Sequence, residues 1–147
     1  MHADAFELHP QLRFDCLELG RFRLCRLLLM NERRYPWLIL VPERPGIGEI
    51  HELGDTDQDH LIRESSCLAG YLKRVFAADR VNVAAIGNLV PQLHVHHVVR
   101  RRDDAAWPAP VWGRSPPEPY YTEAERAGLI SRLQLAALPG LRIGPAP

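Results

Sequence analysis

A chain of 147 residues has the length of one domain with a single hydrophobic core. Its 46% hydrophobic and 24% charged residues exclude a disordered chain, and 18 basic against 18 acidic residues leave no net charge to attract nucleic acid or an anionic membrane. The apolar runs are much shorter than the roughly 20 residues of a spanning helix, and the first residues lack the features of a secretory signal. We therefore expect a cytoplasmic protein with neither nucleic acid nor membrane as a partner.

Two apolar runs in the first third of the chain predict a β-hairpin. They span residues 23–31 and 35–42, and the polar stretch 31–34 between them is short enough for a hairpin turn. The short length of both runs, punctuated by Pro36 and Pro42, favours strand over helix.

The pattern then changes to helix and returns to strand. Thr56 is a candidate N-cap, acidic residues suit the first turn, and an apolar stripe with helical spacing continues to about Ala78. This helix is expected to cover one face of the sheet. Further strands are predicted at residues 81–86 and 93–99, joined by the loop 87–91.

The C-terminal part is predicted to wrap over the surface and end in a helix. Five of the twelve residues 108–119 are proline, which excludes regular helix and disfavours a central strand. Thr122 and Glu125 have the spacing of a capping box, and the helix that they begin is expected to end near 139–140.

The residues with the clearest chemical meaning lie on the last predicted strand. Because side chains alternate along a strand, Gln92, His94 and His96 project from one face at about 7 Å spacing. The opposite, mostly apolar face holds Leu93, Val95, His97 and Val99. One face therefore packs on a core, and the other collects two imidazoles and an amide. His97 is predicted to be packed away from the site.

The imidazole pair fits a two-step transfer at phosphorus. A neutral imidazole has a lone pair that can attack phosphorus, and its ordinary pKa of about 6.5 keeps much of it neutral. Once bound to phosphorus, a histidine is also a good leaving group. His94 is the candidate nucleophile, and His96, one step along, can donate a hydrogen bond or a proton to phosphoryl or leaving-group oxygens.

The residues alone leave other interpretations open. His-x-His on a strand is also a frequent metal-chelating arrangement. The three residues alone support metal binding as well as they support phosphorus chemistry. A metal centre normally needs a third protein ligand, and His9, His51 and His60 show no recognisable ligand spacing. A solvated polar strand face is the third interpretation.

The histidine strand resembles the signature of the histidine triad hydrolases, His-φ-His-φ-His-φ-φ, in which φ is apolar. Residues 88–96, followed by Arg100 and by 103–108, are similar to a bacterial branch described as diadenosine-polyphosphate hydrolase-like. The other stretches that resemble this branch are 28–31, 35–42 and 49–53. The likeness runs from about residue 15 to 113, with hairpin, helix and histidine strand in the family's order.

The elements and this resemblance together predict an α+β fold. It has an antiparallel sheet of about five strands, one helix packed on the sheet and a C-terminal helix. Residues 1–120 are expected to form the domain, with the proline-rich wrap from about 108, and 121–147 to add a helix and tail packed on it. The resemblance also implies a homodimer.

By position, the resemblance assigns roles to five residues. His94 matches the middle histidine, which becomes nucleotidylated, and His96 matches the third, which binds phosphate oxygens. Gln92 replaces the first histidine in both its catalytic and its nucleotide-binding role. A glutamine amide can donate and accept hydrogen bonds, but it cannot take up a proton at neutral pH. The branch also carries glutamine there, which indicates a variant site. Asn31 is implied to contact ribose and Asn88 phosphate, whereas the residues alone favour turn positions for both.

The implied reaction is hydrolysis or transfer at the α-phosphate of a nucleoside phosphate through nucleotidyl-His94. A dinucleoside polyphosphate or a nucleoside phosphoramidate is the expected substrate. No cofactor is expected in the protein, and Mg²⁺, if required, would travel with the substrate. A non-catalytic nucleotide-binding module, disabled by Gln92, is the remaining alternative.

Two other features near the strand allow a functional and a structural interpretation. Residues 100–102 are all arginine and could attract polyphosphate, although a basic run at a strand end is more typical of a solvated turn. Trp107 and Trp112 could stack on a base or close the sheet edge, and burial is favoured for side chains of that size.

Overall fold

The computed structural model describes residues 4–145. The elements in chain order are α1 (Pro10–Asp15), β1 (Cys16–Arg21), β2 (Cys25–Met30), β3 (Trp37–Pro42), the 3-10 helix η1 (Ile50–Glu52), α2 (Asp55–Val75), β4 (Arg80–Ala85), β5 (Val95–Arg100), α3 (Glu123–Leu133), the 3-10 helix η2 (Leu135–Ala137) and β6 (Arg142–Ile143).

The strands form one sheet in the order β4-β5-β3-β2-β1-β6, and every neighbouring pair is antiparallel. The predicted α+β class, with its antiparallel sheet and C-terminal helix, is confirmed. The sheet has six strands where about five were expected, because the two-residue strand β6 adds to the edge beside β1.

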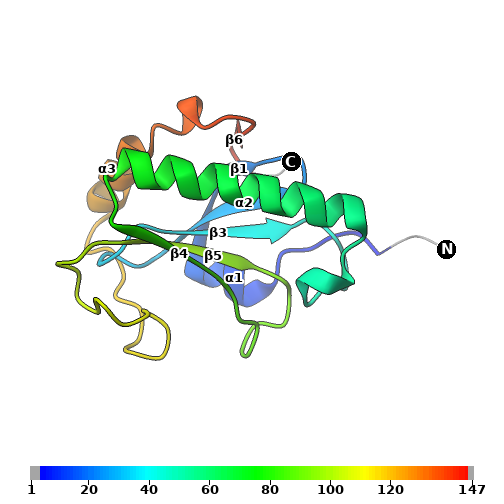
Figure 1. Ribbon diagram of the computed structural model, residues 1–147, viewed down its shortest axis with the longest axis horizontal. Coiled ribbons are helices and arrows are strands. Elements are labelled where there is room, and N and C mark those ends of the chain that lie inside the picture. Colours follow the sequence, from blue (N-terminus) through cyan, green and yellow to red (C-terminus); the bar gives the residue numbers. More distant parts are fainter. Residues whose placement is uncertain (1–3, 146–147) are drawn as a thin grey trace.

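Helices lie on both faces of the sheet (Figure 1). The long helix α2 crosses one face, and the short helix α1 lies against the other. The three leucines in the middle of β2 show how the sheet is shared. Leu27 and Leu29 join the core beneath α2, whereas Leu28 joins the core on the α1 side. A strand buried on both faces has no polar alternation, which explains its continuous apolar sequence.

The helix boundaries correct two details. Helix α2 begins at Asp55 after Gly54, so Thr56 lies inside the first turn and is not the N-cap. The predicted cap of α3 is confirmed, since the Thr122 hydroxyl accepts from the Glu125 N–H at 3.1 Å. This helix ends at Leu133, before residues 139–140, because Gln134 adopts a left-handed conformation with φ of 47°.

Two elements before the hairpin had not been predicted. Helix α1 has six residues; His9 caps it by accepting from the Gln11 N–H, and Pro10 occupies its first turn. Strand β1 is irregular, with a register shift between Glu18 and Gly20. Glycine is needed there because a Cβ at Gly20 would collide with the carbonyl oxygen of Arg142 on β6.

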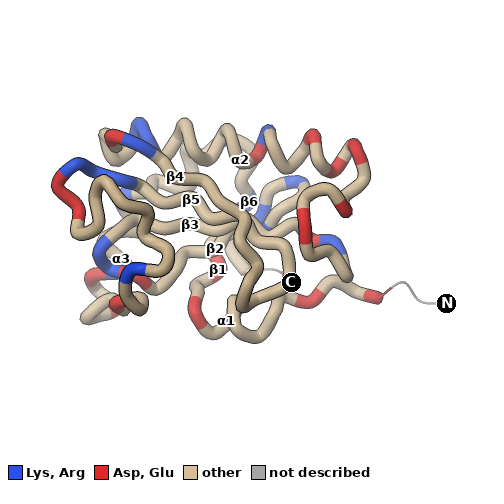
Figure 2. The backbone as a smooth tube through the Cα atoms, turned by 60° about the horizontal axis from the view of Figure 1, so that its bottom comes forward, with Lys and Arg blue, Asp and Glu red and all other residues tan. Residues whose placement is uncertain are grey.

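Charged residues of both signs are mixed over the helices and turns, and the central strands β3 and β5 carry few of them (Figure 2). Across residues 4–145, no helix combines the length and the apolar character needed to cross a bilayer.

Candidate active site

The candidate site lies where the chain enters β5. His94 immediately precedes the strand and His96 is its second residue, and both are buried. Their rings are in edge-to-face contact, with centroids 4.8 Å apart. The predicted sharing of one face is confirmed for these two histidines, whereas the Gln92 side chain bonds to the N-terminal segment. On the other face, Leu93, Val95 and Val99 join the core beneath α2.

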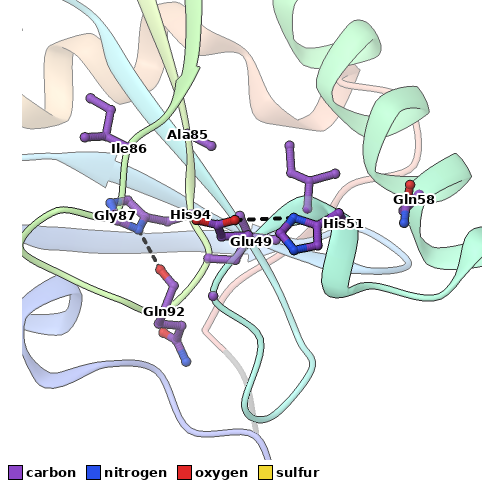
Figure 3. A pocket seen from close by; sticks show the side chains of 11 residues that line it. Glu49, His51, Gln58, Ala85, Ile86, Gly87, Gln92 and His94 are labelled. Carbon is purple, nitrogen blue, oxygen red and sulfur yellow. Dashed lines mark hydrogen bonds and ion pairs between the residues drawn. The ribbon is translucent and has the colours of Figure 1, made fainter.

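His94 is held in one tautomer. Its Nδ1 lies 2.7 Å from the carbonyl oxygen of Gln92, which can only accept, so the ring proton resides on Nδ1 and Nε2 keeps its lone pair (Figure 3). Burial lowers the pKa of His94 and outweighs the opposite effect of the Gln92 carbonyl, while nearby His9 lowers the pKa further. The ring is thus neutral and nucleophilic at neutral pH.

His96 is held in the opposite tautomer. The Trp37 indole N–H donates to its Nδ1 at 3.0 Å, so the proton of the neutral ring resides on Nε2. Burial, followed by the charges of His94 and His97, lowers the pKa of His96 to about 3. His96 therefore presents a neutral N–H donor beside the His94 lone pair. Trp37 was not predicted as a site residue, because it lies 59 positions away on β3.

His97 packs in the core, as predicted. Its Nε2 lies 2.7 Å from the Ser65 hydroxyl on α2, and its Nδ1 lies 3.1 Å from the Val95 carbonyl. Burial is the largest influence on this ring and lowers its pKa to about 4. Both nitrogens are satisfied, so His97 joins the helix to the sheet.

Gln92 uses its side chain to hold the N-terminal segment. Its Oε1 accepts from the backbone N–H of His9 at 2.9 Å, and its Nε2 donates to the carbonyl of Glu7 at 2.8 Å. The backbone carbonyl of Gln92 thus contacts His94, while its side-chain amide is bonded to the N-terminal segment. No sequence signal points to this contact, which joins residues more than 80 positions apart.

A largely apolar cavity of about 580 Å³ opens beside the two histidines. Trp37 and Trp112 contribute aromatic walls to this cavity. Their ring centroids lie within 6 Å of each other, and each lies within 6 Å of the His96 ring centroid. Asp15, at the end of α1, is the one carboxylate among the lining residues. Trp112 thus connects the proline-rich wrap to the site, a contact that the sequence left open between stacking and burial.

The two predicted asparagines differ in position. Asn88 lies in the loop before β5, is exposed and lines the apolar cavity. Asn31 lies in the turn after β2 and is outside the lining of that cavity; its side-chain oxygen accepts from the Tyr120 N–H at 3.2 Å. The next residue, Glu32, is fully buried and accepts from the Glu118 N–H, so this turn fastens the proline-rich wrap.

The arginine run is mainly structural. Arg100 is buried, donates twice to Asp104 and also bonds Asn82 and the Ala109 carbonyl. Burial would raise the pKa of Asp104, but the hydrogen bonds from Arg100 and from two backbone N–H groups lower it to about 2. The other two arginines, at 101 and 102, are exposed at the turn.

Within residues 4–145, no three His, Cys, Asp or Glu side chains converge closely enough to form a metal centre. In both His94 and His96, Nδ1 is already in a hydrogen bond.

Comparisons with known proteins agree with this fold. The HIT domain family matches residues 13–103, and the chain belongs to that family. Its members are generally nucleotide hydrolases or transferases. No curated protein matches the chain significantly.

Three solved bacterial structures are similar over nearly the whole chain. A histidine triad protein from Marinobacter aquaeolei VT8 is 50% identical, with 89% of this chain and 95% of that one covered and a TM-score of 0.85. One from Bradyrhizobium japonicum is 43% identical, with 89% and 97% covered and a TM-score of 0.84. One from Sinorhizobium meliloti 1021 is 44% identical, with 87% and 94% covered and a TM-score of 0.83.

Proposed function

We propose that the protein hydrolyses or transfers nucleoside phosphates through a covalent nucleotidyl-His94 intermediate. The observation that carries this proposal is the tautomer of His94: the Gln92 carbonyl holds the proton on Nδ1, so the lone pair of Nε2 is free. His94 also lines the apolar cavity, where a nucleoside would place its α-phosphorus near that lone pair.

His96 supplies the complementary group. Its Nε2–H donates to a non-bridging phosphate oxygen as negative charge gathers there in the transition state. The hydrogen bond from Trp37 keeps this donor in place without a change of protonation, because the buried ring stays neutral. His94, just before β5, and His96, on β5, thereby act as nucleophile and donor.

The reaction has two displacements. First, the His94 Nε2 lone pair forms a bond to phosphorus while the bond to the leaving group breaks and its electron pair departs with that group. Water then attacks phosphorus and gives up a proton to the solvent, and the P–N bond breaks with its electron pair returning to Nε2. Gln92 acts as a positioning residue here, since its amide is bound to the N-terminal segment.

The apolar cavity suits a nucleoside. Trp37 and Trp112 provide faces and edges for a base, and the Asp15 carboxylate can accept hydrogen bonds from ribose hydroxyls. Asn88 lies close enough to the cavity for contact with phosphate, as the resemblance implied. We assign the ribose contact to Oδ1 of Asp15, whose Oδ2 accepts from the Gln11 side chain, in preference to Asn31, whose side-chain oxygen is engaged with Tyr120. No resident cofactor takes part in this scheme, and Mg²⁺ would arrive with a polyphosphate.

A homodimer through β4 is part of the same proposal. Within residues 4–145, β4 pairs only with β5, so its outer edge is open. Val83 and Ile86, on and after this strand, are 48% and 42% exposed. Open edges with apolar side chains are suited to pairing with another strand. Light scattering should give twice the monomer mass, and Val83→Asp should shift it toward the monomer.

The test compares the native chain with His94→Asn on dinucleoside polyphosphates and adenosine phosphoramidates. We expect at least about a 10⁴-fold loss of turnover, because the nucleophile is removed. Intact-mass spectrometry of rapidly quenched native protein should show one added nucleotidyl group, absent from the variant. His60→Asn, which changes a histidine on α2 outside both cavities that His94 lines, is the matched control. Equal turnover by His94→Asn would refute the mechanism.

A non-catalytic nucleotide-binding module is the second candidate, because Gln92 cannot supply a proton and its amide is engaged. It predicts tight binding of nucleoside monophosphates, with no turnover and no covalent adduct. A metal site at His94 and His96 instead predicts stoichiometric zinc in the purified protein and activity that chelation abolishes.

A further inference from the structure

His94 also faces a second, more polar cavity. Its volume is about 460 Å³, and it is lined by the segment that leads into η1, by Gln58 on α2 and by the chain that leaves β4. Its titratable groups are Glu49, His51 and His94 (Figure 3). The apolar cavity and this one therefore meet at His94. A substrate with its nucleoside in the first would direct its leaving group toward the second.

The leaving group needs a proton that the paired histidines cannot supply. When the bond to phosphorus breaks, an amine must be protonated to depart, whereas a stabilised oxyanion can leave without a proton. His94 attacks with its lone pair, and its only proton is bound to the Gln92 carbonyl. His96 is neutral, since its Nδ1 accepts from Trp37. The amide of Gln92 has no acidic proton to offer.

Among residues 4–145, His51 is the other imidazole that lines the polar cavity. It lies on η1, and its Nδ1 is 3.3 Å from the Glu49 carboxylate. The two side chains are 75% and 71% exposed, so their contact adds little to stability and leaves both free to meet a ligand. Histidine is the side chain that enzymes use most often to exchange protons near neutral pH, and a carboxylate partner orients the ring.

We propose that His51, positioned by Glu49, is the general acid for leaving groups that must be protonated, so that the polar cavity is an amine or alcohol leaving-group site. This proposal rests on the proposed function of His94. As the P–N or P–O bond breaks, its electron pair takes the proton of the His51 imidazolium. Neutral His51 then accepts a proton from the water that attacks nucleotidyl-His94, which restores both residues.

The experiment uses two AMP derivatives that differ only in the leaving group. One is an N-alkyl phosphoramidate, whose amine must be protonated; the other is the p-nitrophenyl ester, whose phenolate leaves as an anion. His51→Gln should lower kcat/KM for the phosphoramidate about 100-fold and for the ester less than about threefold. This ratio, kcat/KM, reports steps up to departure of the leaving group, so later hydrolysis does not mask the effect.

Two further variants complete the test. Glu49→Gln should lower the phosphoramidate rate by about tenfold, because the ring loses its orienting partner. His60→Gln should leave both rates unchanged. Equal slowing of both substrates by His51→Gln, or no slowing of either, would overturn the assignment. His94→Asn separates this outcome from failure of the proposed function: it should abolish both reactions even if His51 proves dispensable.

Discussion

His96 and His97 are neighbours on β5 that face opposite sides of the sheet. Both are buried, both accept a hydrogen bond from a side chain, and burial lowers the pKa of each well below its ordinary value. They differ in their second nitrogen. The Nδ1 of His97 bonds the Val95 carbonyl, whereas within residues 4–145 no protein group bonds the Nε2 of His96, which lines the apolar cavity.

This difference separates a histidine that is bonded through both ring nitrogens from one that keeps an N–H available for a ligand. Burial and a low pKa alone do not mark a site, because His97 has both of these properties within the core. The distinguishing feature of His96 is a fixed proton on a nitrogen that is left available for a ligand. The following predictions test whether this distinction holds.

The largest effect should be a loss of folding stability in acid, to which both histidines contribute. Their folded pKa values of about 3 and about 4 lie below the ordinary value of about 6.5, so the unfolded chain binds more protons between these limits. The contribution of the two neutral rings to the free energy of unfolding should be fully present above about pH 7. It should fall as the pH is lowered, by at most roughly 5 kcal/mol in total at pH 4.5. Urea unfolding at several pH values measures this slope.

Variants at each position sharpen that result. Replacement of either His96 or His97 by asparagine should reduce the pH dependence, because burial lowers the pKa of each ring. A slope that neither replacement changes would mean that other groups control the acid sensitivity.

The second effect concerns activity and should separate the neighbours. His96→Asn should lower kcat by about 10²–10³-fold, because the transition state loses its N–H donor. His97→Asn serves as the control and should keep kcat within about threefold per folded molecule. Steady-state hydrolysis of a dinucleoside polyphosphate gives both numbers. Similar losses in the two variants would contradict the distinction.

The third effect concerns stability alone. His97→Leu should cost about 2–3 kcal/mol, because the Ser65 hydroxyl is left buried without its partner. Adding Ser65→Ala should recover part of this cost, since removing both polar groups is cheaper than removing one. Chemical denaturation of the two single variants and the double variant provides the coupling energy. An additive double variant would show that the pair is not coupled.

The smallest effects should come from the side-chain donors. Trp37→Phe removes the hydrogen bond that fixes the His96 tautomer and should lower kcat/KM about tenfold. Ser65→Ala removes the corresponding bond to His97 and should cost about 1 kcal/mol of stability with kcat/KM unchanged. If Ser65→Ala reduces activity as much as Trp37→Phe does, the two environments are functionally equivalent.

The sequence predicted the parts of the fold that have long or repeated patterns. The hairpin, α2 and the histidine strand have apolar runs or stripes that local physics can interpret. Strand β1 was missed because its register shift near Gly20 interrupts a run of six residues. The two residues of β6 carry no local signal, and their strand exists only through pairing with β1.

For the site, alternation alone placed His94 and His96 on one face and His97 on the other. It could not predict which nitrogen of each ring carries the proton, because that depends on partners in space. The partner of His96 is Trp37 on another strand, and Gln92 is held by a segment at the start of the chain. The contacts of the Gln92 amide and the second cavity beside His94 exist only in the folded molecule.

The two hydrogen bonds between the Gln92 side chain and the N-terminal segment affect how far the chain can be shortened without loss of the candidate site. The HIT domain match begins at residue 13 and ends at 103, so a fragment trimmed to those limits would lack Glu7 and His9, the two backbone partners of the Gln92 amide. It would also lose the cavity walls formed by Leu12 and Trp112. The family boundary therefore cuts through the candidate site, and only a fragment that keeps both flanking segments keeps that site whole.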